Sequence, residues 1–118
     1  MAHHIDTGKT GELLAAAYLQ QHGYMILHTN WRHSHYEIDI IATRNDCLHF
    51  IEIKTRRSSS HGLPEESVSL KKVRSLMKAS AVFLYRHPGW KRVQHDVLSI
   101  TLEDEKKPEY FFIEDVSL

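Results

Sequence analysis

Two strand-forming segments around a short polar break constrain the fold of this chain more than any other feature. The segments, Tyr36–Thr43 and Cys47–Thr55, are rich in Ile, Leu and Phe. The break between them, Arg44-Asn45-Asp46, has the Asn/Asp chemistry of a hairpin turn. The pattern predicts a central β-hairpin, and a two-residue loop at Asn45-Asp46 would pair Arg44 with Cys47.

This register brings two acidic side chains opposite each other. Counting back from the turn, Asp39 lies opposite Glu52, and Glu37 lies opposite Lys54. A four-residue loop gives the same pairs, whereas an odd loop or a bulge would break them. Side chains alternate along a strand, so these four share one face of the hairpin. The opposite face is expected to carry Ile38, Ile40, Ile51 and Ile53.

Opposed carboxylates between apolar strands are costly unless another charge compensates them. Directly opposed side chains have Cβ atoms about 4.5–5.5 Å apart, and two ionised carboxylates ~5 Å apart repel by roughly 3 kcal/mol at an effective dielectric near 20. A divalent cation turns this repulsion into ligation, because hard cations bind oxygen. The alternative is a solvated face with an ordinary Glu37–Lys54 ion pair. Leu48, Phe50 and Ile41 share this face and argue against open solvent.

A longer run of the same hairpin resembles a known family. The run Glu37-Ile38-Asp39 … Phe50-Ile51-Glu52-Ile53-Lys54-Thr55-Arg56 is similar to that of the YraN family, small bacterial proteins of the restriction-endonuclease-like, or PD-(D/E)XK, nuclease superfamily. Asp39 and the later Glu52-Ile53-Lys54 look like the D…(D/E)-x-K signature of that superfamily, a pattern that also occurs by chance. Gly8-x-x-Gly11-Glu12-x-x-Ala15 resembles the opening motif of the family. Tyr36 is a departure, because the family usually has Gly there.

The resemblance implies a metal-dependent nuclease site. Asp39 and Glu52 would ligate Mg²⁺ or Mn²⁺, with help from the Ile53 carbonyl. Lys54 would orient the attacking water and stabilise charge on the phosphorane oxygens. Glu37 is a further catalytic candidate, and Glu12 would reach the metal site from the first helix. For Glu12 the alternative is that an acid in the first turn only complements the helix dipole.

Basic residues after the hairpin are candidates for nucleic-acid binding. Arg56, Arg57 and Lys72 would hold the phosphate backbone, and Lys72 falls on a lysine position of the family. The alternative for the second helix is an ordinary solvated basic face. The formal net charge is zero, but residues 1–100 hold 13 Lys/Arg against 9 Asp/Glu, whereas residues 101–118 hold 2 against 6. The body of the domain is therefore the part expected to meet a polyanion.

Periodicity and end signals place the other elements. Asp6 or Thr7 caps a first helix that ends near His22, with Gly23 as its left-handed C-terminal residue. A second helix is expected from Pro64 to about Arg86, after a polar loop, Arg56–Leu63, at the mouth of the site. Its sheet-facing residues are expected to be Val73, Leu76, Met77, Ala81 and Leu84. The remaining strands are expected at Tyr24–Asn30, Val93–Leu102 and Tyr110–Ile113.

These elements predict one α/β domain over residues 1–118, a mixed central β-sheet flanked by helices in the restriction-endonuclease-like order α-β-β-β-α-β-β. The single cysteine and the lack of a signal segment or membrane span favour a cytoplasmic protein. His33 and His35 lack the further ligands of a zinc site and are assigned to a surface loop. Asp96 is expected to be structural. The sequence leaves open whether the chain forms a homodimer.

The leading functional expectation is a divalent-metal-dependent nuclease that hydrolyses DNA phosphodiester bonds, with branched and junction DNA among the substrates to test. The alternative is a catalytically inactive nuclease-fold module that binds nucleic acid or a protein partner. Tyr36 in place of Gly and the neutral net charge keep this alternative open. No membrane association is expected.

Overall fold

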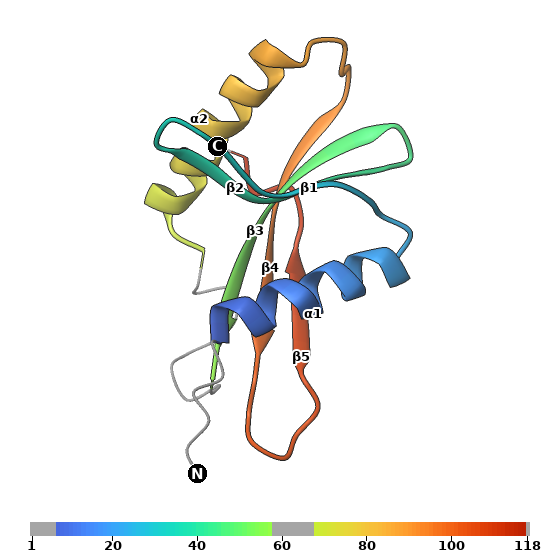
Figure 1. Ribbon diagram of the computed structural model, residues 1–118, viewed down its shortest axis with the longest axis vertical. Coiled ribbons are helices and arrows are strands. Elements are labelled where there is room, and N and C mark those ends of the chain that lie inside the picture. Colours follow the sequence, from blue (N-terminus) through green and yellow to red (C-terminus); the bar gives the residue numbers. More distant parts are fainter. Residues whose placement is uncertain (1–6, 58–67, 118) are drawn as a thin grey trace.

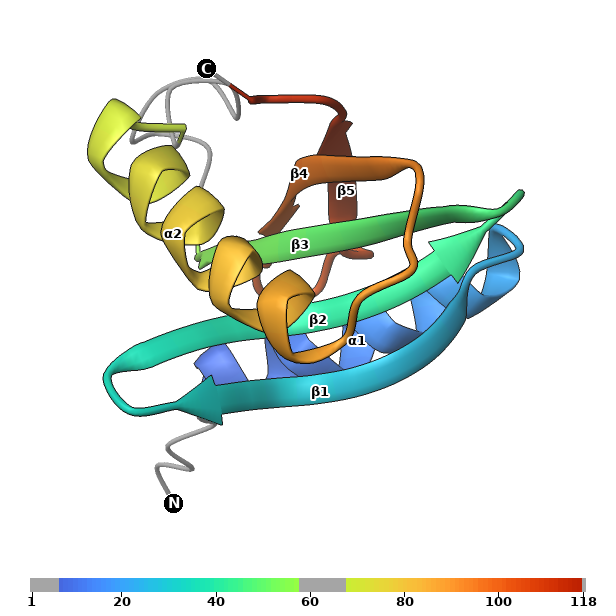
Figure 2. The same cartoon turned by 90° about the horizontal axis from the view of Figure 1, so that it is seen from above.

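A central sheet carries one helix on each of its faces in the computed structural model, which describes residues 7–57 and 68–117 (Figures 1 and 2). The elements are α1 (Thr7–Gln21), β1 (Met25–His33), β2 (Tyr36–Arg44), β3 (Cys47–Arg56), α2 (Leu70–Arg86), β4 (Val93–Thr101) and β5 (Glu109–Ile113). This order confirms the predicted α-β-β-β-α-β-β arrangement. In the described part of the chain, neither helix is long and apolar enough to cross a membrane.

The sheet is mixed, as predicted. Its strands follow the order β1-β2-β3-β4-β5, and all neighbours are antiparallel except the parallel pair β3–β4. Parallel neighbours need a crossover connection, and α2 lies in the one that joins β3 to β4. The two strands of the predicted hairpin, β2 and β3, therefore lie near the middle of the sheet.

The β2–β3 hairpin has the predicted turn and register. Asn45 and Asp46 have φ angles of 54° and 60°, the left-handed pair of a type I′ turn, and Arg44 pairs with Cys47. The paired residues end at Ile40 and Ile51. Beyond them β2 continues beside β1 and β3 beside β4, so the two strands diverge (Figure 1). We call this divergence the fork.

Two apolar clusters hold the helices to the sheet. The α1 cluster is formed by Ala15, Leu19, Tyr24, Ile40, Ala42, Ile51, Leu98 and Ile100. The α2 cluster is formed by Ile38, Ile41, Leu48, Phe50, Leu76, Ala79 and Phe83. The prediction for the buried face of α2 was partly wrong, because Ala81 is exposed while Ala79 and Phe83 are buried.

Ile38 also corrects the expected alternation along β2. It packs in the α2 cluster, whereas Ile40, two residues on, packs against α1. The physical reason lies in the neighbouring strand β1, where Asn30 has a φ of 52° between the paired residues Thr29 and Trp31. A left-handed residue interrupts the regular pleat and increases the local twist. The β1–β2 ribbon therefore turns at the level of Asp39.

The C-terminal end of α1 agrees with the prediction, whereas the N-terminal end of α2 does not. Gly23 follows α1 with a φ of 86°, as predicted for a left-handed C-terminal residue. The first residue of α2 is Leu70 rather than Pro64, because extended Ser69 caps the helix and its Oγ accepts a hydrogen bond of 3.1 Å from the Lys72 backbone N–H. Pro64, Glu65, Glu66 and residues 58–63 of the expected loop lie outside the described residues.

Candidate functional site

Asp39 lies at the fork and bonds across it. Its Oδ2 accepts a hydrogen bond of 2.7 Å from the backbone N–H of Ile53. Burial raises the pKa of the Asp39 carboxyl, the hydrogen bond from Ile53 lowers it, and the charges of Glu12 and Glu37 raise it again. The carboxylate is therefore held in a fixed position and is surrounded by other acids.

Glu52 is the second acid of the fork, one residue beyond the last β2–β3 pair. Burial raises its pKa from 4.5 to about 7, and the charge of Asp39 adds to this rise. Val73, Leu76 and Val97 lie around a small void of about 10 Å³ beside Glu52, which Lys54 and Lys72 also line. The two carboxylates expected to oppose each other are therefore close enough to interact electrostatically and are partly withdrawn from water.

Two clefts meet at Asp39. The first, cleft A, has a volume of about 510 Å³ and lies between the fork and α2. It is lined by His35, Tyr36, Glu37, Asp39, Glu52, Ser69, Lys71, Lys72, Ser75, Leu76 and Lys78. The second, cleft B, has a volume of about 270 Å³ and lies between the N-terminal part of α1 and β3. It is lined by Gly8, Glu12, Asp39, Ile53, Lys54 and Thr55.

Glu12 reaches the site from α1, the position that the resemblance implied. It lines cleft B together with Asp39, and its charge raises the pKa of Asp39. The Asn30 side chain in β1 donates a hydrogen bond of 3.3 Å from Nδ2 to Glu12 Oε2. Asn30 thus orients a candidate ligand, a role that the sequence analysis did not assign. Asn30 therefore has two unusual features at this position, a left-handed backbone in β1 and a side-chain hydrogen bond to α1.

Glu37 and Lys54 do not lie opposite each other as the register predicted, and they do not form the cross-strand ion pair of the alternative interpretation. Glu37 instead forms an ion pair of 3.2 Å with Arg32 of β1, and both side chains are exposed. The cause is the fork, because β2 pairs with β1 at this level and no longer with β3. Glu37 lines cleft A, whereas Lys54 is exposed and lines cleft B. Lys54 is nevertheless close enough to lower the pKa of Glu52.

Of the three basic residues predicted to bind phosphate, only Lys72 lies at the site. It lines cleft A and lowers the pKa values of both Asp39 and Glu52. Arg56 donates from Nε to Thr101 Oγ1 at 3.2 Å, and Arg57 forms an exposed ion pair of 3.5 Å with Asp104. These arginines line neither cleft. Lys71 and Lys78 of α2 line cleft A with Lys72 and make a basic wall opposite the acids.

Asp39 and Glu52 could supply two carboxylate ligands to a hard divalent cation, but they do not form a complete ligand set made of protein groups alone. Within residues 7–57 and 68–117, no three His, Cys, Asp or Glu side chains are grouped closely enough to hold a metal ion. Mg²⁺ is usually held by one or two carboxylates, waters and substrate phosphates. The N–H and C=O of a strand residue point to the same neighbouring strand, so the Ile53 carbonyl also faces the fork.

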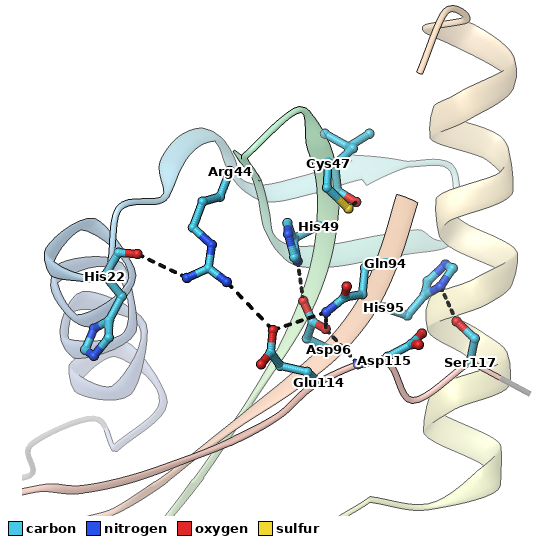
Figure 3. Close-up of polar contacts among 11 residues, drawn as sticks. His22, Arg44, Cys47, His49, Gln94, His95, Asp96, Glu114, Asp115 and Ser117 are labelled. Atoms are coloured by element: carbon cyan, nitrogen blue, oxygen red, sulfur yellow. Dashed lines mark hydrogen bonds and ion pairs between the residues drawn. The ribbon is translucent and has the colours of Figure 1, made fainter. Parts of the chain in front are cut away.

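A separate polar network surrounds Asp96 of β4 (Figure 3). Asp96 is fully buried and accepts hydrogen bonds from His49 Nδ1 at 2.7 Å, Gln94 Nε2 at 2.8 Å and the Asp115 backbone N–H at 2.9 Å. The expectation that Asp96 is structural is therefore supported. His95, the neighbour of Asp96 in β4, forms a hydrogen bond of 2.8 Å between its Nδ1 and Ser117 Oγ. These contacts hold the C-terminal segment against β4.

Comparison with known proteins gives the family. The family model described as "Uncharacterised protein family UPF0102" matches residues 11–100, which include most of α1, the whole β2–β3 hairpin and α2. The chain belongs to family UPF0102. The matched UPF0102 segment contains all the candidate site residues, and this result agrees with the YraN-like resemblance of the sequence.

Bacterial UPF0102 proteins match nearly the whole chain. One from Bacteroides thetaiotaomicron is 38% identical over 104 residues, which cover 88% of this chain and 86% of the relative. One from Cytophaga hutchinsonii is 40% identical over 101 residues, covering 86% and 89%. One from Rhodococcus opacus is 38% identical over 118 residues, covering 98% of each. Each is described only as a UPF0102 protein, a name that states no activity.

Proposed function

We propose that the fork is the active site of a Mg²⁺- or Mn²⁺-dependent nuclease that hydrolyses DNA phosphodiester bonds. The observation that carries the proposal is the pair Asp39 and Glu52, both half-buried and both with raised pKa values. A chain selected for stability alone gains nothing from two such acids, whereas perturbed carboxylates in a cleft are common at functional sites. The resemblance to restriction-endonuclease-like nucleases supports the same assignment.

The proposed roles are metal ligation by the acidic side chains and orientation of the attacking water by Lys54. Asp39 and Glu52 would hold the cation with the Ile53 carbonyl, and Glu12 is within reach as a further ligand from cleft B. When bound, the cation supplies positive charge to the scissile phosphate and its attacking water. Lys54, in cleft B beside Asp39, would orient that water and stabilise charge on the phosphorane oxygens.

The basic wall of cleft A supports a polyanionic substrate. Lys71, Lys72 and Lys78 face Glu37, Asp39 and Glu52 across the cleft. Lysine side chains attract phosphate without reading sequence, so they would position the backbone while the fork performs the cleavage. Glu37 lines the same cleft but is engaged with Arg32, so a catalytic role for it would require that exposed ion pair to open. Such exposed pairs are worth only about 0–1 kcal/mol.

Incubation with a panel of labelled linear, flapped and four-way DNA substrates, in Mn²⁺ and in chelator, tests this proposal. The expected result is strand cleavage that requires Mn²⁺ and is lost in Asp39→Asn and Glu52→Gln. A Tyr85→Leu variant is a control, because Tyr85 is 89% exposed on α2 and lines neither cleft. Equal cleavage by the acid variants would show that another site, or a contaminant, cuts the DNA.

One observation favours the alternative of an inactive binding module. The Asp39 oxygen already accepts a hydrogen bond from Ile53, so this acid has a structural partner without any metal. The module would use the same basic wall to hold nucleic acid but would not hydrolyse it. Metal-independent binding of every substrate in the panel, with no cleavage in Mn²⁺, would favour this second function.

A further inference from the structure

The tip of the β1–β2 hairpin brings aromatic rings to the mouth of cleft A. His35 is exposed, Tyr36 is half-buried, and their ring centroids lie 4.1 Å apart with an interplanar angle of 33°. Both residues line cleft A, the cleft that also contains Asp39, Glu52 and the lysines of α2. In Figure 2 the tip of this hairpin and the N-terminal half of α2 lie at the same side of the molecule, apart from each other.

The α2 cluster holds the Tyr36 side chain in place. Its ring packs against the α2 cluster, which is buried around Phe50, Leu76 and Phe83. A ring fixed by the core loses little conformational entropy when a ligand stacks on it. His35, one residue before β2 in the turn, lies beside the same ring, and the two tilted rings together form a small aromatic surface.

We infer that His35 and Tyr36 form a stacking platform for an unpaired base next to the nucleotide whose phosphate reaches the fork. This inference rests on the proposed nuclease function and specifies its substrate as DNA with unpaired nucleotides. Every base has a π-face, so stacking on aromatic side chains binds single strands with little sequence preference. The lysines opposite supply the matching phosphate contacts.

A continuous duplex does not fit this surface. The base faces of a duplex are covered by their neighbours, and a protein reaches only base edges and the backbone unless a base is extruded. Cleft A, at about 510 Å³, falls within the roughly 300–1,000 Å³ range of small-ligand sites. It therefore accepts a nucleotide-sized group rather than a double helix.

Binding measured in chelator, where cleavage is excluded, tests the inference. Fluorescence anisotropy gives the Kd of the protein for a flapped DNA and for a continuous duplex of the same length at one salt concentration. Tyr36→Leu keeps an apolar side chain against the core but removes the ring. We expect it to weaken binding of the flapped DNA by about five- to 150-fold and to leave duplex binding unchanged.

Matched variants separate stacking from folding. Tyr36→Phe retains the ring and should bind the flapped DNA like wild type, whereas His35→Ala should weaken it less than Tyr36→Leu. Tyr85→Leu makes the same substitution at an exposed position away from the cleft and should have no effect. A thermal melt of each variant verifies that it is folded. With 2-aminopurine at the unpaired position, the fluorescence change on binding should disappear in Tyr36→Leu.

The outcomes distinguish this inference from the function on which it rests. Equal loss of flapped and duplex binding in Tyr36→Leu, or no loss of either, overturns the stacking platform. If wild type still cleaves DNA in Mn²⁺, the nuclease proposal survives that result. If wild type binds neither DNA in chelator and cleaves neither in Mn²⁺, both proposals are wrong.

Discussion

Asp39 Oδ2 and the backbone N–H of Ile53 form a hydrogen bond of 2.7 Å at the point where β2 and β3 stop pairing. The bond replaces the ladder contact that the diverging strands can no longer make. It also fixes a carboxylate between cleft A and cleft B. The stability of the fork and its proposed ion binding therefore involve the same side chain, and substitutions of Asp39 can test each of them.

Asp39→Asn is expected to leave the metal-free protein as stable as wild type, or more stable by up to about 2 kcal/mol. The amide oxygen can still accept the bond from Ile53, while one charge of the acidic group is removed. Chemical denaturation in chelator gives the two free energies of unfolding. A variant clearly less stable than wild type would indicate that Asp39 serves mainly as a hydrogen-bond acceptor.

Glu52 should make the stability of the metal-free protein depend on pH. Its pKa is about 7 in the folded state against 4.5 for an ordinary Glu, so the folded state binds more protons between these values. The contribution of Glu52 to the free energy of unfolding is therefore fully present below pH 4.5, and it is lost as the pH rises through about 7. The measurement is the free energy of unfolding in chelator against pH for wild type and Glu52→Gln.

Subtracting the two pH profiles isolates Glu52 from groups with the opposite effect. His95, for example, has a pKa lowered by burial, so its contribution is fully present above its unfolded pKa of 6.5 and is lost as pH falls from that value through the lower, folded pKa. Both proteins contain His95, and the difference cancels it. A difference that does not change between pH 5 and pH 8 would contradict the raised pKa of Glu52.

Lys72→Ala should weaken DNA binding uniformly and reduce its salt dependence. Each phosphate contact contributes a slope of about −0.7 in log K against log salt on single strands and about −0.9 on duplex DNA, so loss of Lys72 should make the slope for flapped DNA shallower by about one contact. Lys107→Ala is the matched control, because Lys107 is exposed between β4 and β5, outside both clefts. Identical slopes for both variants would make the basic wall an ordinary solvated face.

Gly11→Ala should destabilise the packing of α1 on β3. A Cβ at Gly11 would lie 2.0 Å from Thr55 Oγ1 and 3.0 Å from Thr55 Cβ. Overpacking of this kind costs typically about 1–3 kcal/mol, which exceeds the helix propensity gained from Ala, about 1 kcal/mol. Adding Thr55→Ala removes the nearest atom and should restore most of the loss. Denaturant melts of the single and double variants measure both effects.

The hairpin could be predicted from sequence because its determinants are local. Asn45 and Asp46 favour the left-handed turn, and the turn sets the pairing of Arg44 with Cys47. The same register put Asp39 and Glu52 together, and the charges of these two acids do affect each other. Residues of the β2–β3 hairpin alone were enough to predict this part of the candidate site.

The rest depended on contacts that no local pattern encodes. Asn30 has a left-handed backbone beside Asp39, Ile38 packs in the α2 cluster, and Glu37 forms an ion pair with Arg32. Lys72 of α2 lines cleft A and Lys54 of β3 lines cleft B, and both also border the small void beside Glu52. Asn30 stands at the end of the expected strand Tyr24–Asn30, and nothing in the local pattern indicates that its side chain bonds to Glu12 of α1.

Thermal melting of wild type and Asp39→Asn in chelator and in Mn²⁺ tests the central claim, that the fork binds a divalent cation, most directly. A ligand that binds only the folded state stabilises it by about 2.7 kcal/mol at 100 times its Kd. The account predicts that Mn²⁺ raises the Tm of wild type and of the Lys107→Ala control but not that of Asp39→Asn. A Tm shift of equal size in Asp39→Asn, or no shift in wild type with or without flapped DNA, would contradict the account.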